Sequence, residues 1–200
     1  NYLGGKAAEA GGGALEIDGS PSLSTKYIGI DVESAGTTAV SIQNNVIRNI
    51  TIKSVSSGAF TGIYAYSTRC NIGNVTGNII GSATGNGSIT VVSYSTSSTT
   101  SSGITNTASI GDVFVSNNRI GSITVSNNNA AETASFTGIH IGTPTSGTLT
   151  VSNNTIGSTE TSNSIRASNA ATGNNTDAQS VVGINAGTYG GLTTVVSGNT

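Results

Sequence analysis

The chain has 200 residues, enough for one substantial domain, and 34% of them are hydrophobic. Only 8% are charged, and 7 basic residues against 9 acidic ones give a net charge of −2, which excludes a basic surface for nucleic acid or anionic lipid. The sequence contains no run of roughly 20 apolar residues, so we expect no membrane insertion.

Ser, Thr, Asn and Gly dominate the composition, and this bias is also typical of disordered chains. Short runs with alternating β-branched residues argue against disorder, as in SIQNNVI (41–47), NITIKS (49–54) and TGIYAYS (61–67). Alternation is the period of a β-strand. The sequence therefore predicts an all-β protein.

Residues 1–13 (NYLGGKAAEAGGG) precede the first alternating run and are predicted to be a lead-in or an N-terminal cap. The next stretch, ALEIDGS (14–20), aligns with TLTVSNN (148–154), which predicts a strand and places Ser20 in line with the Asn residues that recur later. We expect one domain over residues 14–200. Because VVSGNT (195–200) stops inside a copy of the repeated motif, we expect this domain to continue beyond residue 200.

Two short sequence motifs recur together along the chain. Gly-Ile pairs begin at Gly29, Gly62, Gly103, Gly138 and Gly183. An Asn follows each Ile after 14 or 15 residues, at Asn45, Asn78, Asn118, Asn154 and Asn199. The separation from an Asn to the next Gly varies between 17 and 29 residues, so one part of the repeat is fixed and another accepts insertions. Repeats of about 33 to 45 residues are typical of solenoids and propellers.

Each repeat offers three short strand-like pieces, which predicts a right-handed parallel β-helix with three strands per coil and about five coils. A β-propeller is the alternative, but its blades carry four strands and more aromatic residues than the 4% found here. In a β-helix, equivalent residues of successive coils stack into columns about 4.8 Å apart. The Asn residues of the repeat would then form a hydrogen-bonded asparagine ladder, with each bond contributing about 1 kcal/mol.

The residues beside the ladder have predicted roles as well. A column at the bend contains Asn or Gly, which tolerate left-handed backbone: Asn44, Gly77, Asn117, Asn153 and Gly198. Two apolar columns are predicted to point into the core: Ile42, Val75, Val115, Val151 and Val196, and Ile47, Ile80, Ile120 and Ile156. Inserted loops are predicted on one side of alternate coils, at 92–102 and 159–180, either as solvent-exposed spacers or as a rim that contacts a ligand.

The motif VxxNxI, as in residues 151–156, and the Gly-Ile strands resemble the parallel β-helix repeats of the pectin-lyase-like superfamily, from about residue 14 to the end. The chain is especially similar to the Ser, Thr and Asn-rich segments of large secreted bacterial surface proteins and adhesins. That resemblance implies an extracellular or cell-surface location. It implies no single activity, because the superfamily includes polysaccharide lyases, hydrolases, adhesins and passive stalks.

Acidic residues are too sparse to predict a catalytic centre. A glycosidase needs paired carboxylates, and the sequence has neither the paired-Asp nor the Gly-His-Gly motif of the polygalacturonase-like members. The single His140 and single Cys70 exclude a His and Cys metal cluster, and Cys70 is predicted to be a small buried residue. We therefore predict no catalytic residues, no metal and no cofactor.

One column on the outer surface suggests a weak glycan-binding site. If the Ile of each Gly-Ile pair is buried, the next residue points outwards, which places Asp31 and Glu33 beside Tyr64 and Tyr66 of the next coil. Carboxylates accept hydroxyl protons and an aromatic ring covers the apolar face of a sugar. The alternative is that these residues are ordinary solvent-facing side chains. His140 lies three coils from Asp31, about 14 Å away and too far for a catalytic pair.

Regular Thr columns can also order water in ice-binding proteins, and Thr51, Thr90 and Thr124 are predicted to align in a short array. The sequence as a whole favours a non-catalytic structural or adhesive segment of a bacterial surface or fibre protein. The alternative is a carbohydrate-active or glycan-binding β-helix. The expected partners are a surface glycan or other subunits of a larger surface assembly.

Overall fold

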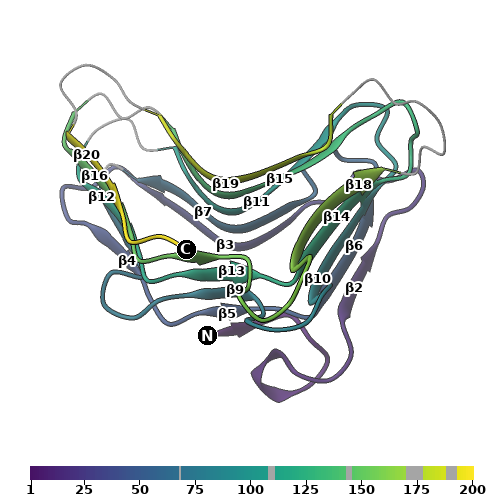
Figure 1. Cartoon of the computed structure of the whole chain (residues 1–200), viewed down its shortest axis with the longest axis horizontal. Helices are drawn as coiled ribbons and strands as arrows, with labels where there is room; N and C mark the ends of the chain where they lie inside the picture. The colour runs from purple at the N-terminus through teal and green to yellow at the C-terminus, as the bar shows by residue number, and fades with distance from the viewer. Residues whose placement is uncertain (68, 108–110, 143–145, 170–177, 188–192) are drawn as a thin grey trace.

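The computed structural model describes residues 1–67, 69–107, 111–142, 146–169, 178–187 and 193–200. Their strands form four parallel sheets of five strands each, and the chain passes through the four sheets in the same order in every coil (Figure 1). The predicted parallel β-helix of about five coils is confirmed. Within the described residues, no helix is long and apolar enough to span a membrane.

We name the four sheets by their positions in Figure 1. The floor sheet contains β1 (Tyr2–Leu3), β5 (Val46–Ile47), β9 (Ile79–Gly81), β13 (Arg119–Gly121) and β17 (Thr155–Ile156). The first wall contains β2 (Leu15–Asp18), β6 (Ile50–Ser54), β10 (Ile89–Ser93), β14 (Ile123–Asn127) and β18 (Ile165–Asn169). The concave sheet contains β3 (Tyr27–Ser34), β7 (Phe60–Ser67), β11 (Thr99–Asn106), β15 (Ala134–Ile141) and β19 (Ser180–Ala186). The second wall contains β4 (Val40–Ile42), β8 (Cys70–Ile72), β12 (Val113–Ser116), β16 (Thr148–Ser152) and β20 (Thr193–Ser197).

Each coil has four strands, so the prediction of three strands per coil is wrong. The predicted strand-like piece 41–47 is divided, because β4 ends at Ile42 and β5 begins at Val46. Between them Asn44 has a φ of 54°, in the left-handed region that turns the chain from the second wall into the floor sheet. The bend and the ladder therefore lie between two strands.

The asparagine ladder occupies this corner and is buried. The exposed fractions of Asn45, Asn78, Asn118 and Asn154 are all 4% or less. Each side-chain Nδ2 donates to the Oδ1 of the next Asn, over 2.8 to 3.0 Å from Asn45 to Asn199. The backbone N–H of each of these donors also donates to that same Oδ1, so four amide oxygens accept two hydrogen bonds each, those of Asn78, Asn118, Asn154 and Asn199.

The ladder begins at Asn1, which the sequence did not predict. Its Nδ2 donates to Asn45 Oδ1 over 2.8 Å, and β1 pairs in parallel with β5. The placement of Ser20 in this column is wrong, because Leu15 pairs with Ile50 and puts residues 15–18 in the first wall. Residues 4–13, which include the 3₁₀ helix Ala8–Ala10, pack against the corner between the floor sheet and the first wall, where Asn49 Nδ2 donates to Ala10 O.

Because of a three-residue insertion in the second repeat, two of the predicted columns contain other residues than the motif alignment placed in them. Val75 is 81% exposed, and Ile72 takes its place in register with Ile42 and Val115. Gly77 is not left-handed, whereas Gly73 is, with a φ of 78°. Asn117, Asn153 and Gly198 have the expected left-handed backbone, with φ values between 56° and 62°. The extra residues bulge outwards while the core residue stays in its column.

The Gly-Ile pairs create the concave sheet. A Cβ on Gly62 would lie 2.6 Å from Gly103 O and 2.9 Å from the side chain of Ile80 in the floor sheet, and Gly103 has the same surroundings one coil later. Only glycine allows the sheet to approach the floor so closely. The sheet dips between two raised rims in Figure 1 as a result.

Aliphatic side chains fill the space between the floor sheet and the walls. The column Ile47, Ile80 and Ile120 is fully buried as predicted, and Ile156 near the last coil is half-buried. Polar side chains occupy the interior where the strands of the first wall end, and Ser54, Ser93 and Asn127 stack there in register.

The inserted segments differ from the predicted loops 92–102 and 159–180. Most of 92–102 lies in β10 and β11, and 159–180 contains β18, while residues 170–177 lie outside the described residues. The floor-to-wall corner carries insertions at 82–88 and 157–164, because Asn78 to Ile89 spans 11 residues where Asn45 to Ile50 spans 5. The two corner loops touch across the intervening coil, where Gly85 N donates to Thr161 Oγ1 over 3.1 Å.

Candidate functional site

The outer surface of the concave sheet brings the predicted acidic and aromatic residues together. Strand register places Asp31 beside Tyr64 and Glu33 beside Tyr66. Both carboxylates are exposed, and Tyr66 is 51% exposed. Tyr64 is half-buried, and its hydroxyl lies 3.2 Å from Thr107 Oγ1. The four side chains thus lie on two neighbouring strands, and glycan binding by them remains a prediction.

A hydroxyl-lined pocket of about 250 Å³ lies further along the same surface. Its lining residues come from β11, β15 and β19: Thr100, Ser102, Thr105, Thr137, His140 and Asn185. Thr105 Oγ1 donates to Ser102 Oγ over 2.8 Å, and Ser102 Oγ donates to Thr61 Oγ1 over 3.3 Å. Hydroxyl and amide groups both donate and accept hydrogen bonds, as the hydroxyls of a neutral sugar do.

The sequence pattern did not predict this pocket. Its signal was present in TTSSGIT (99–105), where hydroxyl residues occupy the outward positions of a strand. His140 stands three strands from Asp31 along the sheet, as predicted, and it lines the pocket alongside Thr105 and Asn185.

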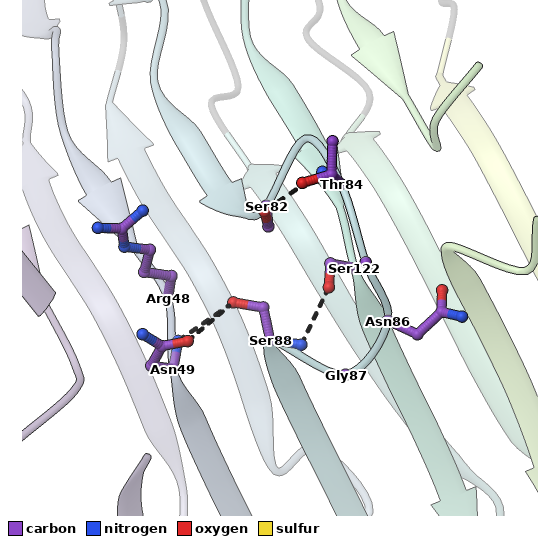
Figure 2. Close-up of a pocket in the computed structure, with 9 residues that line it drawn as sticks. Arg48, Asn49, Ser82, Thr84, Asn86, Gly87, Ser88 and Ser122 are labelled. Atoms are coloured by element: carbon purple, nitrogen blue, oxygen red, sulfur yellow. Dashed lines mark hydrogen bonds between the residues drawn. The ribbon is translucent and has the colours of Figure 1, made fainter. Parts of the chain in front are cut away.

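A second polar pocket, of about 310 Å³, opens at the corner between the floor sheet and the first wall (Figure 2). Its lining residues are Arg48, Asn49, Ser82, Thr84, Gly85, Asn86, Gly87, Ser88 and Ser122. Ser122 Oγ accepts from Ser88 N over 3.0 Å, and Ser82 Oγ accepts from Thr84 N over 3.3 Å. Main-chain bonds to these hydroxyl groups hold the corner loop in place.

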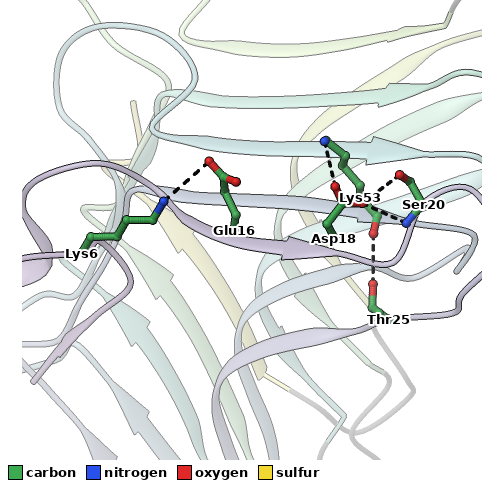
Figure 3. Close-up of polar contacts among 6 residues, drawn as sticks. All are labelled: Lys6, Glu16, Asp18, Ser20, Thr25 and Lys53. Atoms are coloured by element: carbon green, nitrogen blue, oxygen red, sulfur yellow. Dashed lines mark hydrogen bonds and ion pairs between the residues drawn. The ribbon is translucent and has the colours of Figure 1, made fainter.

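Exposed charged residues gather on the outer face of the first wall and beside it (Figure 3). Lys53 Nζ lies 3.0 Å from Asp18 Oδ2, and Lys6 Nζ lies 3.7 Å from Glu16. Ser20 donates to Asp18 Oδ1 from both its hydroxyl and its backbone N–H. The Ser20 hydroxyl, followed by Lys53, lowers the pKa of Asp18 to about 2, and Asp18 in turn raises the pKa of Lys53.

The predicted Thr column lies on this same wall and is short. Thr51, Thr90 and Thr124 pair in register as expected. Glu16 precedes them and Arg166 follows them, so charged side chains bound the array on both sides. The array ends at Arg166 on β18, which occupies the position after Thr124 in this column.

Cys70 and the remaining acids do not form a reactive or metal-binding group in the described part of the chain. Cys70 is fully buried, as predicted, and burial raises the pKa of its thiol to about 12, which keeps it protonated at neutral pH. The described residues contain no group of three or more His, Cys, Asp or Glu side chains placed to hold a metal ion.

Comparison of the chain with protein-family models, with curated proteins and with solved structures gave no significant match. The parallel β-helix is therefore established by the strand pairing and the ladder of this chain alone.

Proposed function

We propose that this chain is a non-catalytic structural segment of an extracellular bacterial surface protein, of the pectin-lyase-like or adhesin type. The observation that carries the proposal is the continuous asparagine ladder, which joins successive coils from Asn1 to Asn199 through amide hydrogen bonds that are buried between Asn45 and Asn154. Such a wall of parallel sheet resists bending between coils and suits a rigid support.

The two ends of the stack support association with other subunits of a surface assembly. At the first coil, Ile30, Val32, Val40 and Ile42 line an open pocket of about 250 Å³ together with Asn1. At the last coil, four valines of β19 and β20 are 37 to 52% exposed: Val181, Val182, Val195 and Val196. Unpaired strand edges and exposed apolar side chains favour an additional layer of sheet at each end.

An activity screen tests the non-catalytic role. The purified chain is incubated with a panel of neutral and acidic polysaccharides, and new reducing ends and unsaturated products are measured. We expect no turnover above that of heat-denatured protein. Turnover by the native chain that disappears in Asp31→Asn would overturn the proposal and favour a carbohydrate-active enzyme.

A labelling experiment tests the location. Antibodies raised against the chain are applied to intact and to permeabilised producing cells, and we expect equal labelling of both. Labelling that requires permeabilisation contradicts a surface role.

Glycan binding by the concave sheet is the second candidate function. Two observations favour it: the acidic residues stand beside Tyr64 and Tyr66, and the hydroxyl-lined pocket with His140 lies on the same surface. An aromatic ring stacked on a sugar contributes binding energy through its apolar face, while the polar groups distinguish sugars by the arrangement of their hydroxyls. The raised rims in Figure 1 border this surface on both sides.

A glycan array tests this second function, with the Tyr66→Ala variant as the main comparison. We expect wild-type binding to a subset of neutral glycans and at least a roughly tenfold weaker signal for the variant, because a stacked ring is lost. Phe114→Ser is the matched control, since Phe114 is an outward-facing aromatic residue on the second wall. Equal loss in both variants would contradict a specific site on the concave sheet.

A further inference from the structure

The hydroxyl-lined pocket of the concave sheet offers a ligand mainly hydrogen-bond acceptors. Its lining side chains lie on the outer surface of β11, β15 and β19 and are half-buried or exposed, so a ligand can reach them. A serine or threonine hydroxyl has one proton to donate and two lone pairs that accept. The hydrogen bonds that these protons already make therefore decide which ligand groups the pocket can bind.

Two of the hydroxyls form a chain that leads to the neighbouring strand. Thr105 Oγ1 donates to Ser102 Oγ over 2.8 Å, and Ser102 Oγ donates to Thr61 Oγ1 of β7 over 3.3 Å. Both protons are thus engaged within the protein. Within the described residues, Ser102 Oγ accepts one side-chain hydrogen bond and Thr105 Oγ1 accepts none, so each oxygen keeps a lone pair for a ligand.

Thr100 is a third acceptor of the pocket. Its Oγ1 lies 3.2 Å from Ser135 Oγ, and the Ser135 hydroxyl donates to Thr99 O over 3.2 Å. Because Ser135 has a single proton, Thr100 is the donor in the bond between the two side chains. The exposed Thr100 oxygen is therefore also left with lone pairs and no proton for a ligand.

The charges of the concave sheet favour a cation. Its five strands contain two carboxylates, Asp31 and Glu33, and no Lys or Arg. A third carboxylate, Glu132, lies two residues before β15 and accepts from Ser98 Oγ over 3.3 Å. None of the three carboxylates belongs to an ion pair in the described part of the chain. Such a surface attracts positive charge and repels anions.

An ammonium group matches both the acceptors and the charge. It has three N–H donors, no acceptor and a positive charge. Hydrogen bonds from a charged donor are stronger than those between neutral groups. Tyr64 and Tyr66 lie on the same surface, and the faces of aromatic rings attract cations as well. A sugar with an amino group therefore satisfies this surface more fully than a sugar with hydroxyls alone.

We propose that the concave sheet prefers glycans with free amino groups, and that the amino group binds in the hydroxyl-lined pocket against the oxygens of Thr100, Ser102 and Thr105. This inference rests on glycan binding by the concave sheet and names the class of sugar that the site prefers. Neutral glycans offer hydroxyl protons to the same oxygens without a charge, so they bind more weakly. Acidic glycans are repelled by the carboxylates.

Calorimetric titration of the full chain with matched oligosaccharides tests the proposal. The ligands are oligomers of glucosamine, of N-acetylglucosamine and of glucose, with equal length and linkage, at neutral pH. We expect the glucosamine oligomer to have a Kd at least about tenfold lower than the other two, and this Kd to rise with added sodium chloride because salt screens the charges. Equal Kd values, or tighter binding of the N-acetylated oligomer, would overturn the preference and leave glycan binding intact. No binding of any of the three would overturn both.

A substitution within the pocket separates a specific site from general attraction to an acidic protein. Thr105→Val removes one acceptor with little change in shape, and we expect the Kd of the glucosamine oligomer to rise about tenfold. Thr150→Val is the matched control, because Thr150 is a half-buried, outward-facing threonine on the second wall, and its Kd should equal the wild-type value. An unchanged Kd in folded Thr105→Val, or equal changes in the two variants, shows that the proposal is wrong.

A charge introduced at Thr100 provides an independent measurement. Thr100 is exposed, so its substitution should have little effect on folding. In Thr100→Lys the added positive charge should raise the Kd of the glucosamine oligomer at least about tenfold and change that of the glucose oligomer by less than about twofold. Thr100→Gln adds a side chain of similar reach without the charge and is the control. Equal effects of the two substitutions on the glucosamine oligomer would contradict an ammonium site in this pocket.

Discussion

Asn118, near the middle of the ladder, shows how a single residue joins three coils. Its Oδ1 accepts from both the backbone N and the Nδ2 of Asn78, and its own Nδ2 donates to Asn154 and to Ile72 O. It is 1% exposed, so water cannot replace these partners. The contribution of such a residue lies mainly in satisfying polar groups that its neighbours have already buried.

Replacing Asn118 by alanine should therefore be costly. Asn118→Ala leaves two donors of Asn78 without an acceptor, and we expect the free energy of unfolding to fall by about 2 to 4 kcal/mol in urea titrations followed by circular dichroism. The neighbouring Asn117 is exposed and has a φ of 60°, so Asn117→Gly should change it by less than about 0.5 kcal/mol. Similar losses in the two variants would contradict a structural role for the ladder amides.

Asp18 gives a second residue-scale prediction, which concerns pH. Its pKa is about 2 in the folded protein, below its ordinary value of 3.8, so the carboxylate contributes stability that is present above about pH 4 and is lost as the pH falls towards 2. In an NMR titration of the side-chain carboxyl, Ser20→Ala and Lys53→Gln should each raise this pKa, because the Ser20 hydroxyl and the Lys53 ammonium both stabilise the carboxylate. An unchanged pKa in either variant would show that the substituted group does not act on Asp18.

At the scale of the element, the concave sheet depends on contact between its glycine column and the isoleucines of the floor sheet. The strand pairing skips each of these glycines, and the flanking residues stay in register. The bend places the outward residues on the inside of a curve, where side chains from three strands line one pocket. The same glycines that pack the core thus shape the candidate binding surface.

Alanine substitutions at two glycines of one column distinguish the effect of close packing from the effect of backbone conformation. A Cβ on Gly103 would lie 2.6 Å from Gly138 O and 3.0 Å from Ile120, whereas a Cβ on Gly183 would meet nothing within 4 Å. Neither glycine has a left-handed φ. Gly103→Ala should lower the free energy of unfolding by about 1 to 3 kcal/mol, and Gly183→Ala by less than about 0.5 kcal/mol. Equal values in urea unfolding would contradict close packing between the two sheets.

At the scale of the whole molecule, stability should decrease from the central coils towards the ends. The apolar residues of β10, β11 and β12 that face the core are fully buried, whereas the equivalent residues of β3, β19 and β20 are half-buried or exposed. Strands inside the stack have two neighbours and terminal strands have one. Repeat proteins gain stability from each interface between adjacent units.

Hydrogen exchange measured by mass spectrometry tests this gradient. We expect the slowest exchange in peptides from β10 to β13 and the fastest in peptides from β18 to β20, with β2 to β4 between them and the centre. Added coils or subunits at the open ends would slow exchange there first. Uniform protection along the chain would instead indicate a single cooperative unit without fraying ends.

The pattern of the sequence was sufficient for the coil and for the ladder, because both repeat at a nearly constant spacing. The Asn residues lie 14 or 15 positions after each Gly-Ile pair, and in parallel sheets equal spacing produces stacking. Asp31 and Tyr64 were placed side by side by the same reasoning. The motif alignment failed at Val75, where a short insertion shifted the apparent match by three residues and left Ile72 in the core.

By itself, the sequence determined that the chain is a parallel β-helix, that its amide ladder runs from Asn45 to Asn199 and which isoleucines face inwards, because these follow from periodicity along one strand path. Only the tertiary structure decided that each coil has four strands, that the concave sheet bends onto the floor sheet, and that Arg48 and Ser122 line one pocket. These features depend on contacts between different sheets and between inserted loops of alternate coils. Local spacing does not encode such contacts, since they depend on how far each insertion reaches and on which side chains leave room for the neighbouring backbone.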